Sequence, residues 1–471
     1  MIILGTNSIK DAGGFNVANS LRFNSGSSDY LNRTPGSASN KDLWSISAWV
    51  KRTKLGGYDT IYGVFDDSSN QENFGFLNSD KFQWQLYQSG GVVGQLTTNR
   101  LFRDVGSWYH ILGVYDSANG TAGNRMRLYI NGVEETSFAT DTNPSDGQDS
   151  QWNSDKLHMI GGGGTASGGD FFDGYISELV AVDGTALSPT DVGEFDSDSG
   201  IWKPINVSGL TFGTNGFYLQ FEQSGTSANS SGMGADTSGN THHFSVNNLT
   251  AVDQSIDTCT NNFATLNPLS VNTNQGTFSE GNLQLLHGSN AFRTGFASIG
   301  ATKGKWYCEI KRVTATSFAV GVISLDFKSI TPNITYMGGV GTPNLGYFRD
   351  GNTGVNGSET SGFASYANGD TLMIGLDLDN GKVYFGKNGT WGNSGDPTSG
   401  STGTGARSIT VGGETWSFGV SVYNATAQCN FGSPPYAISS GNTDGDGFGN
   451  FEYAVPSGYF SLCTKNLAEY G

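Results

Sequence analysis

The sequence predicts an all-β protein built from two antiparallel β-sandwich domains of the jelly-roll type. Glycine supplies 70 of the 471 residues, about twice its usual share, so the chain is rich in turns. Segments in which apolar and polar residues alternate recur along the chain, as in half-buried strands. Helical periodicity is nearly absent, while aromatic residues still make up 12% of the chain. These observations favour packed, turn-rich sandwiches over a helical or disordered chain.

Alternating segments predict the strands of a first sandwich. The clearest are residues 43–50, 80–87, 125–130 and 175–182. Asn131 and Gly132 follow the third segment and favour a two-residue hairpin, because both turn positions need a positive φ. Ser188 and Pro189 have the pattern of a short helix start, with an N-cap followed by proline at the first helical position.

The composition then changes, and this change predicts the domain boundaries. Ser, Asn, Thr and Gly dominate the middle of the chain, which we interpret as an ordered, mostly irregular connector. Alternation returns at residues 305–311 and 372–379, and Asn380 with Gly381 predicts a second two-residue hairpin. We therefore expect an N-terminal arm at 1–17, sandwiches at 18–197 and 280–471, and the connector at 198–279.

Charge and hydropathy limit the partners. The chain has 42 acidic and 25 basic side chains, a formal charge of −17. Duplex DNA and anionic membranes attract clustered Lys and Arg, so we expect no nucleic acid and no membrane insertion. Residues 1–4 are apolar, but the stretch is too short for the core of a secretory signal. We therefore expect synthesis without secretion.

Four cysteines carry no recognisable metal or redox pattern. Cys259, Cys308, Cys429 and Cys463 lie far apart, without zinc-ligand spacing. We expect free thiols that pack as small apolar groups, and one disulfide is left open.

Two blocks of the sequence resemble known sandwich families. Residues 18–197 resemble a laminin-G-like (concanavalin A-like) domain, and residues 280–470 a SPRY domain. The matching stretches are 21–31, 44–51, 108–115, 127–132 and 172–178 in the first block, and 304–309, 318–322, 369–377 and 381–389 in the second. Both resemblances imply two-sheet folds, and the SPRY resemblance implies ligand binding by loops at one end of the sandwich.

The combination also resembles structural proteins of tailed bacteriophages. Residues 257–268, followed by a SPRY-like block that ends in residues 451–467, carry this resemblance. It implies a tail fibre, a tail-associated adhesin or a capsid decoration, located in the virion after assembly in the host cytoplasm. The implied partners are other virion proteins and a host cell-surface glycan or receptor. We also expect a homo-oligomer, with the apolar residues 1–4 buried against a partner.

Catalysis needs acids that converge, and the sequence does not predict such a set. Glycoside hydrolases of the jelly-roll class place their acids on one face of a strand. Asp173, Glu178 and Asp183 are five residues apart, and odd offsets point to opposite faces. His242 and His243 lack a nucleophile motif. We therefore expect no catalytic residue and no enzyme.

One segment resembles half of a calcium loop. Residues 442–447 place oxygen ligands at alternate positions, with Gly447 at the bend. The twelfth position is Tyr453, and Glu452 lies one residue early. We therefore expect no cofactor and no metal, with calcium left open.

Exposed rings are the expected ligand-binding residues. Tyr347, Phe348 and Trp391 lie in Gly- and Asn-rich segments, where rings and hydrogen-bonding groups suit glycan stacking. The alternative is that these rings pack under loops.

The function expected from the resemblances is a non-enzymatic phage virion protein at the surface, a tail fibre or adhesin that mediates host attachment. Two alternatives stay open: a capsid decoration or head fibre, and a glycan-processing enzyme.

Overall fold

The computed structural model describes residues 14–163, 168–269, 276–325 and 334–471. These residues form two compact units, the first unit up to residue 260 and the second unit from residue 261. Nearly all regular structure is β, and α1 (Thr464–Tyr470) is the single α-helix among the described residues. The predicted all-β class is therefore confirmed.

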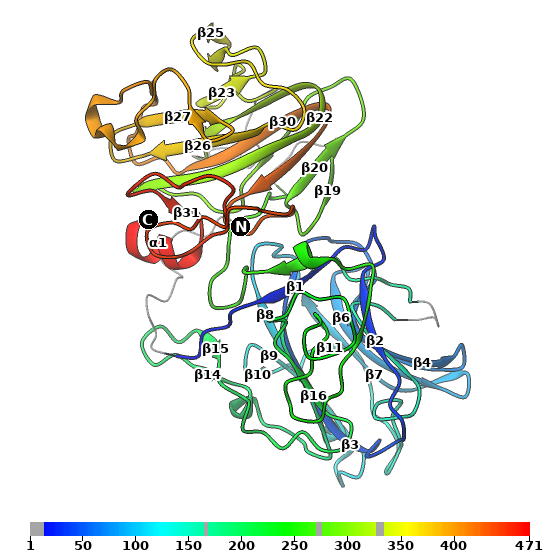
Figure 1. Ribbon diagram of the computed structural model, residues 1–471. Coiled ribbons are helices and arrows are strands. Elements are labelled where there is room, and N and C mark those ends of the chain that lie inside the picture. The colour runs from blue at the N-terminus through cyan, green and yellow to red at the C-terminus, as the bar shows by residue number, and fades with distance from the viewer. Residues whose placement is uncertain (1–13, 164–167, 270–275, 326–333) are drawn as a thin grey trace. The chain divides into compact units, whose positions relative to one another are not determined.

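Two antiparallel eight-stranded sheets face each other in the first unit (Figure 1). The β3 sheet contains, in order, β10 (Val133–Glu134), β9 (Met126–Ile130), β8 (Tyr109–Asp116), β3 (Leu43–Arg52), β13 (Gly174–Asp183), β1 (Ser20–Phe23) and β18 (Gln254–Ser255), with β16 (Phe217–Leu219) beside β13. The β6 sheet contains β11 (Phe138–Thr142), β7 (Gly91–Leu101), β6 (Lys81–Gln88), β5 (Asn70–Phe76), β4 (Asp59–Asp67), β12 (Leu157–Ile160), β2 (Tyr30–Arg33) and β17 (Ser245–Asn247). A small hairpin and three short 3₁₀ turns complete the unit, namely β14 (Gly193–Phe195) with β15 (Trp202–Pro204), η2 (Ala122–Asn124), η3 (Pro189–Asp191) and η4 (Ala251–Asp253).

The core of the first unit lies between its two sheets and is rich in aromatic rings. Trp44 of β3 and Trp84 of β6 are both fully buried, as their alternating segments predict. Trp152 stacks on Trp44 with ring centroids 4.3 Å apart, and Tyr62 packs against Trp152 at 3.8 Å. The indole of Trp44 also donates a hydrogen bond to Ser150 Oγ, so its polar nitrogen has a partner inside the core.

The turn signals of this unit are confirmed. Asn131 and Gly132 join the paired residues Ile130 and Val133, and their φ values are 50° and 77°. Ser188 begins η3 with a capping box that Asp191 completes.

The expected connector differs from the structure, because its first part belongs to the first unit. Within 198–260, β16 pairs with β13, β17 pairs with β2, and β18 pairs with β1. These strands are only two or three residues long, so period-two alternation cannot reveal them. The unit boundary therefore falls at 260/261, well before the expected start of the second sandwich.

The same segment covers the outer face of the β3 sheet. A second apolar cluster forms there, made of Leu112, Val114, Tyr129, Val180, Val182, Leu187, Val192, Val207, Phe212 and Tyr218. Residues from four strands of the sheet and from the covering segment contribute to it. The β3 sheet is consequently buried on both faces.

The second unit is one curled sheet of 13 strands among the described residues. Its elements are β19 (Thr277–Ser279), β20 (Gln284–His287), β21 (Arg293–Phe296), β22 (Lys305–Ser324), β23 (Asn344–Phe348), β24 (Thr353–Val355), β25 (Ser358–Thr360), β26 (Thr371–Asp377), β27 (Lys382–Lys387), β28 (Thr390–Trp391), β29 (Arg407–Ser408), β30 (Trp416–Asn430) and β31 (Phe460–Ser461), with the 3₁₀ segment η5 (Pro397–Thr402). β22 pairs with β30 along most of its length. A bulge in β22 between Arg312 and Thr314 marks the point where this strand passes from one layer of the unit to the other. The segments 305–311 and 318–322 are thus two parts of one long strand.

One predicted turn in this unit is wrong. Asp377 pairs with Lys382, so the β26–β27 loop contains the four residues 378–381 instead of two. Gly381 still takes a positive φ of 63°, as the Asn-Gly pair suggested.

Some expectations are not tested by this structure. The apolar residues 1–4, on which the expected oligomer contact depends, lie outside the described residues. Within the described ranges, no helix has the length and hydropathy of a membrane span.

Loss of the Trp152 ring should destabilise the first unit. Trp152 is 2% exposed and packs against both Trp44 and Tyr62, so Trp152→Ala should lower the free energy of unfolding by about 3–5 kcal/mol. Denaturant unfolding followed by tryptophan fluorescence measures this change. Trp391→Ala, at a half-buried indole in the second unit, is the matched control. An unchanged transition of the first unit in Trp152→Ala would contradict the packing described.

Candidate functional site

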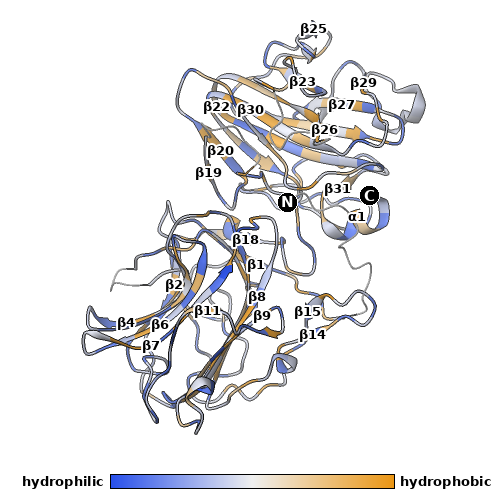
Figure 2. Cartoon of the chain, turned by 180° about the vertical axis from the view of Figure 1, so that it is seen from behind, coloured by the Kyte–Doolittle hydropathy of each residue, from blue (hydrophilic) through white to orange (hydrophobic). Residues whose placement is uncertain are grey.

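The outer face of the β6 sheet is polar and remains partly exposed, unlike that of the β3 sheet. Along β6, Phe82, Trp84 and Leu86 are buried, while Gln83 and Gln85 are half-exposed on the other face. Antiparallel register places Gln85 between Asn73 of β5 and Gln95 of β7. Hydrophilic stretches on β6 and β7 are visible in Figure 2. We call the group Gln71, Asn73, Gln83, Gln85, Gln95 and Thr97 the amide platform.

Cross-strand hydrogen bonds order the side chains of the amide platform. Gln85 Nε2 donates to Gln95 Oε1 at 2.8 Å, and Gln95 Nε2 donates to Thr97 Oγ1 at 3.0 Å. Gln83 Nε2 also points to Thr97 Oγ1, at 3.3 Å. Because each amide is fixed by a neighbour on the next strand, the platform presents a preset pattern of donors and acceptors.

Two hydrogen-bond acceptors of the amide platform have no donor among the described residues. The buried atoms Gln71 Oε1 and Asn73 Oδ1 have no hydrogen-bond donor among the described residues. A buried acceptor without a donor is costly, so these atoms favour a donor from water or from a ligand hydroxyl. The loop at 161–163 lies against this edge, because a Cβ on Gly163 would be 2.7 Å from Asn73 Oδ1.

Half-exposed rings flank the platform. Tyr87 of β6 and Phe65 of β4 lie directly opposite Gln71 on its two sides, so the three residues share one row of the sheet. Neither this row nor the rows through Gln83 and Gln85 carry an acidic side chain among the paired residues of β5, β6 and β7. The arrangement combines hydrogen-bonding amides with apolar ring faces, which suits a neutral polar ligand.

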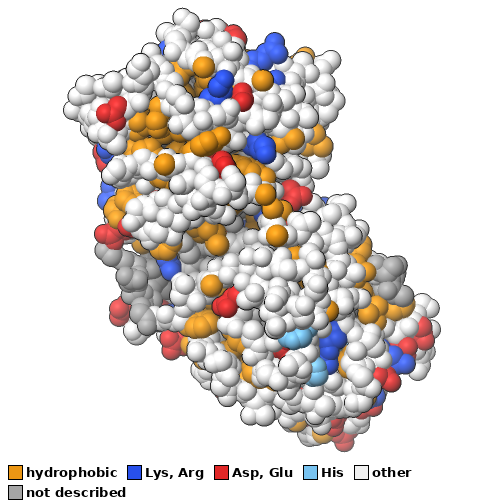
Figure 3. All heavy atoms as spheres, in the orientation of Figure 1, with side chains coloured by type: hydrophobic (Ala, Val, Ile, Leu, Met, Phe, Trp, Pro, Cys, Tyr) orange, Lys and Arg blue, Asp and Glu red, His pale blue; other side chains and the backbone are white. Residues whose placement is uncertain are grey.

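The surface as a whole has few charges. In the face drawn in Figure 3, acidic and basic side chains are scattered among uncharged atoms. Charged residues are 14% of the chain, in keeping with this picture.

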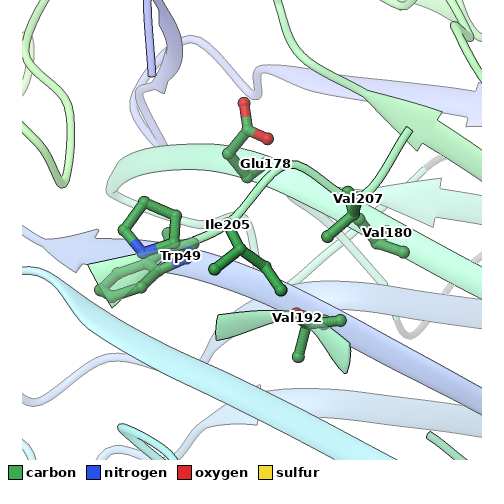
Figure 4. Close-up of a pocket in the computed structure, with 8 residues that line it drawn as sticks. Trp49, Glu178, Val180, Val192, Ile205 and Val207 are labelled. Carbon is green, nitrogen blue, oxygen red and sulfur yellow. The ribbon is translucent and has the colours of Figure 1, made fainter. Parts of the chain in front are cut away.

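A small pocket lies on the covered side of the β3 sheet. Its lining consists of Ser47, Trp49, Glu178, Val180, Val192, Pro204, Ile205 and Val207 (Figure 4). Its free volume of about 10 Å³ is room for about one water molecule, far below the range of roughly 300–1,000 Å³ for ligand pockets. Because the lining is mainly aliphatic, a hydroxyl-rich ligand would lose its water without finding partners there.

Glu178 at the rim of this pocket has an unusual environment. It occupies a bulge in β13 with φ 49°, and its carboxyl accepts a short hydrogen bond from Tyr218 OH. Burial raises the pKa of Glu178 from its ordinary 4.5 to about 7, against the opposing effect of the Tyr218 hydrogen bond. A carboxyl of this kind could act as an acid, but it is the one acidic side chain among the residues that line the pocket.

The three acids considered for hydrolysis each have separate partners. Asp173 accepts from Ser25 and is paired with Lys54 Nζ at 3.2 Å. Asp183 accepts from Asn40 Nδ2 at 2.9 Å and from the Asn215 amide at 2.8 Å, far along β13 from Asp173. The structure therefore does not bring Asp173, Glu178 and Asp183 together.

The expected ring site in the second unit is not assembled. Tyr347 is only 2% exposed, and its hydroxyl donates to the Ala364 carbonyl, so no ring face is left for a sugar. The neighbouring Phe348 points to the other side of β23 and packs with Met337 and Ile323. The physical reason is that residues 344–348 form a strand, whose alternate side chains enter the two layers.

Trp391, like Phe348, is more exposed than Tyr347. It is half-buried against a cluster that includes Tyr307 and Tyr384. Its role in ligand binding stays a prediction.

The segment resembling a calcium loop is a hydrogen-bond hub instead. Asp444 Oδ2 accepts from the Ser461 amide, Ser461 Oγ and Asn466 Nδ2, at 2.7–2.9 Å. Its Oδ1 accepts from the amides of Asp446 and Phe448. The carboxylate is thus used to hold the loop against β31 and α1. Among the described residues, no three His, Cys, Asp or Glu side chains are grouped so that they could hold a metal ion.

The histidines and cysteines have structural environments. The Asp236 amide donates to His243 Nδ1 at 3.0 Å, and the His242 amide donates to Asp236 Oδ2 at 2.8 Å, so the pair orders a loop. The four cysteines are all free thiols, as expected. Burial raises the pKa of each thiol, to about 11 for Cys463, which keeps the thiols protonated and unreactive.

Comparison with known proteins gives a family match for part of the chain. Residues 25–193 match the family model of the concanavalin A-like lectin/glucanases superfamily. No curated protein matches the chain. The matched residues include the three strands of the amide platform, β5, β6 and β7, and its flanking rings.

The solved structures that the comparison matches include a SPRY domain, a pentraxin and a pair of laminin domains. The SPRY domain of human HERC1 is 20% identical, with 35% of this chain and 96% of that chain covered and a TM-score of 0.27. A heptameric SAP-like pentraxin from Limulus polyphemus is 16% identical, with coverages of 37% and 81% and a TM-score of 0.27. Domains LG4-5 of the mouse laminin α1 chain are 10% identical, with coverages of 89% and 90% and a TM-score of 0.30.

The amide platform was missed by the sequence analysis, although its signal is present. In residues 81–88 the alternation marks Phe82, Trp84 and Leu86 as core and equally marks Gln83 and Gln85 as outward-facing. Four glutamines and an asparagine at matching positions of adjacent strands could have been noticed. The register that places these residues side by side depends, however, on bulges in the pairing of β6 with β7, and these bulges are not evident in the sequence.

Ionisation of Glu178 should make the first unit less stable as pH rises. The folded protein holds the Glu178 proton more tightly than the unfolded chain, because its pKa is about 7 rather than 4.5. Its contribution to stability is therefore full below about pH 4.5 and is lost as pH rises through 7. Glu178→Gln keeps an acceptor for Tyr218 but cannot ionise. Its unfolding free energy, relative to wild type, should increase between about pH 5 and about pH 8. Parallel pH profiles of variant and wild type in urea unfolding would contradict this environment.

Calcium should not stabilise the second unit. The Asp444 carboxylate already accepts five hydrogen bonds. Adding about 1 mM Ca²⁺ should therefore leave the thermal unfolding midpoint of this unit unchanged relative to a control with chelator. A Ca²⁺-dependent rise that Asp444→Asn removes would show that the loop rearranges to bind the ion.

Proposed function

We propose that the chain is a non-enzymatic glycan-binding protein of a tailed-bacteriophage virion, a tail fibre or adhesin that attaches the particle to its host. The observation that carries the binding part is the amide platform, an open and uncharged polar sheet face. It lies within residues 25–193, the segment that matches the concanavalin A-like lectin/glucanases superfamily.

The chemistry of the platform suits sugars without formal charge. Sugar hydroxyls both donate and accept hydrogen bonds, as do the amides of Asn73, Gln85 and Gln95. Beneath these amides, Gln71 Oε1 and Asn73 Oδ1 are buried acceptors that have no donor among the described residues. Phe65 and Tyr87 supply apolar ring surface beside them. The formal charge of −17 would repel polyanions, which favours neutral glycans.

A flat and shallow surface binds one sugar weakly. Useful attachment would therefore come from many copies acting together, as on a virion. This requirement agrees with the homo-oligomer and with the virion partners that the phage resemblance implies. The host cell-surface glycan or receptor is the ligand in this proposal.

Two other functions would require different structural features. A capsid decoration or head fibre would need the assembly contacts but no host ligand. A glycan-processing enzyme would need converging acids, whereas Asp173, Glu178 and Asp183 have separate partners in the structure.

Binding should depend on the platform. A multimerised full-length chain is applied to an array of neutral and acidic host-surface glycans. Asn73→Ala combined with Gln85→Ala should weaken binding of the best neutral ligand about tenfold or more. Gln284→Ala is the matched control, because Gln428 Nε2 donates to Gln284 Oε1 in a similar cross-strand amide pair of the second unit. If Trp391→Ala abolishes binding and the platform variant does not, the end-loop site is the correct one.

The virion role has its own test. Purified chain should compete with particles for adsorption to host cells, and a labelled antibody against the chain should mark the tail. Capsid labelling without any effect on adsorption would favour decoration. Release of reducing sugar from host polysaccharide, lost in Asp173→Asn or Glu178→Gln, would instead favour the enzyme.

A further inference from the structure

A lysine and an aspartate from distant parts of the first unit meet in its interior. Lys51 lies on β3, and Asp257 follows β18, 206 residues later. Lys51 Nζ is 2.8 Å from Asp257 Oδ2, and the two side chains are 0% and 1% exposed. Complete burial of both partners sets this pair apart from Lys305 and Asp377 of the second unit, where the lysine side chain is 24% exposed.

The surroundings fix the pair and exclude water. The Lys51 ammonium lies 5.4 Å from the centroid of the Tyr175 ring. Trp108 Nε1 donates to Asp257 Oδ1 at 3.2 Å, on the opposite side of the carboxyl from the lysine. The Asp257 carbonyl accepts from Ser20 Oγ at 2.6 Å, which holds the backbone in place.

Such an environment changes the chemistry of an ion pair. Transfer of one proton from the ammonium to the carboxylate, across the 2.8 Å contact between Lys51 Nζ and Asp257 Oδ2, brings an amine and a carboxylic acid together. A neutral lysine amine is a nucleophile, and held against a carboxyl it reacts as if at very high concentration. Exclusion of water also removes the species that would reverse the reaction.

We propose that Lys51 and Asp257 join in an intramolecular amide bond. Lys51 Nζ attacks Cγ of Asp257, the N–C bond forms, and one C–O bond breaks. The departing oxygen takes two protons from the former ammonium and leaves as water. The ammonium and carboxylate are thereby converted to one amide and one water, with no change of oxidation state and no co-reactant. Trp108 Nε1–H is placed to polarise the carboxyl through the oxygen that stays.

The bond would covalently join β3, early in the first unit, to the segment after β18 at the end of the unit. It closes a loop of 206 residues that contains most of both sheets, and it restricts the unfolded chain accordingly. It also fastens the returning segment near residue 260, the boundary between the units. The nearby Arg22–Asp253 pair, at 3.1 Å, cannot form the same bond, because a guanidinium stays protonated.

Mass spectrometry of the intact full-length chain tests the proposal. The wild type should weigh less than its sequence by the mass of one water, and a branched fragment should contain both Lys51 and Asp257. Lys51→Arg and Asp257→Ala should each restore the full sequence mass. Asp257→Asn should lose ammonia in place of water. No branch should form between Lys305 and Asp377, the half-exposed control pair.

The contradicting result is equally plain. A wild-type mass equal to the sequence mass after prolonged incubation of the folded protein would show a simple ion pair. This measurement uses the wild type alone, so it stays decisive even if a variant fails to fold. A water loss that persists in Lys51→Arg would place the bond elsewhere and also overturn the assignment.

Discussion

The structure of the first unit depends on the return of residues 198–260 across the outer face of the β3 sheet. Short strands pin this segment, since β16 adds to β13 and β18 adds to β1. Two buried side-chain contacts, Arg22–Asp253 and Lys51–Asp257, join it to the sheet. Breaking the Arg22–Asp253 ion pair would leave an uncompensated buried charge, which is far more costly than losing a surface pair. The segment is therefore part of the fold, and it removes one of the two sheet faces from solvent.

This constraint determines where a ligand can bind the first unit. With the β3 sheet covered on both sides, the polar face of the β6 sheet is left as a broad surface of ordered amides. Its strands are rigid because their inner faces hold Phe82, Trp84 and Leu86 in the core. A rigid platform loses little conformational entropy on binding, which suits recognition by many weak contacts. The buried Glu178, by contrast, is enclosed by the covering segment and has an aliphatic pocket beside it.

Much of the fold could be predicted from local patterns, and the site could not. Alternation revealed Trp44 and Trp84 as core residues, and Asn131 with Gly132 as a hairpin, because both signals lie within a few residues of chain. Tyr347 was misassigned because glycines and asparagines flank a short strand that the sequence marks only weakly. Asp444 has the spacing of a calcium ligand, yet Ser461 and Asn466, which occupy its carboxylate, arrive from later in the chain. The amide platform needs the pairing of β5, β6 and β7 and also the covering of the opposite sheet. Both are long-range features that no single segment encodes.

The central claim is that the free polar face of the β6 sheet is the glycan-binding surface. A crystal structure of the full-length chain with a bound neutral oligosaccharide tests it most directly. The account predicts sugar density over Asn73, Gln85 and Gln95, with sugar hydroxyls hydrogen-bonded to amide groups of the platform. Sugar bound at Trp391 in the second unit, with the amide platform covered only by water, would contradict it.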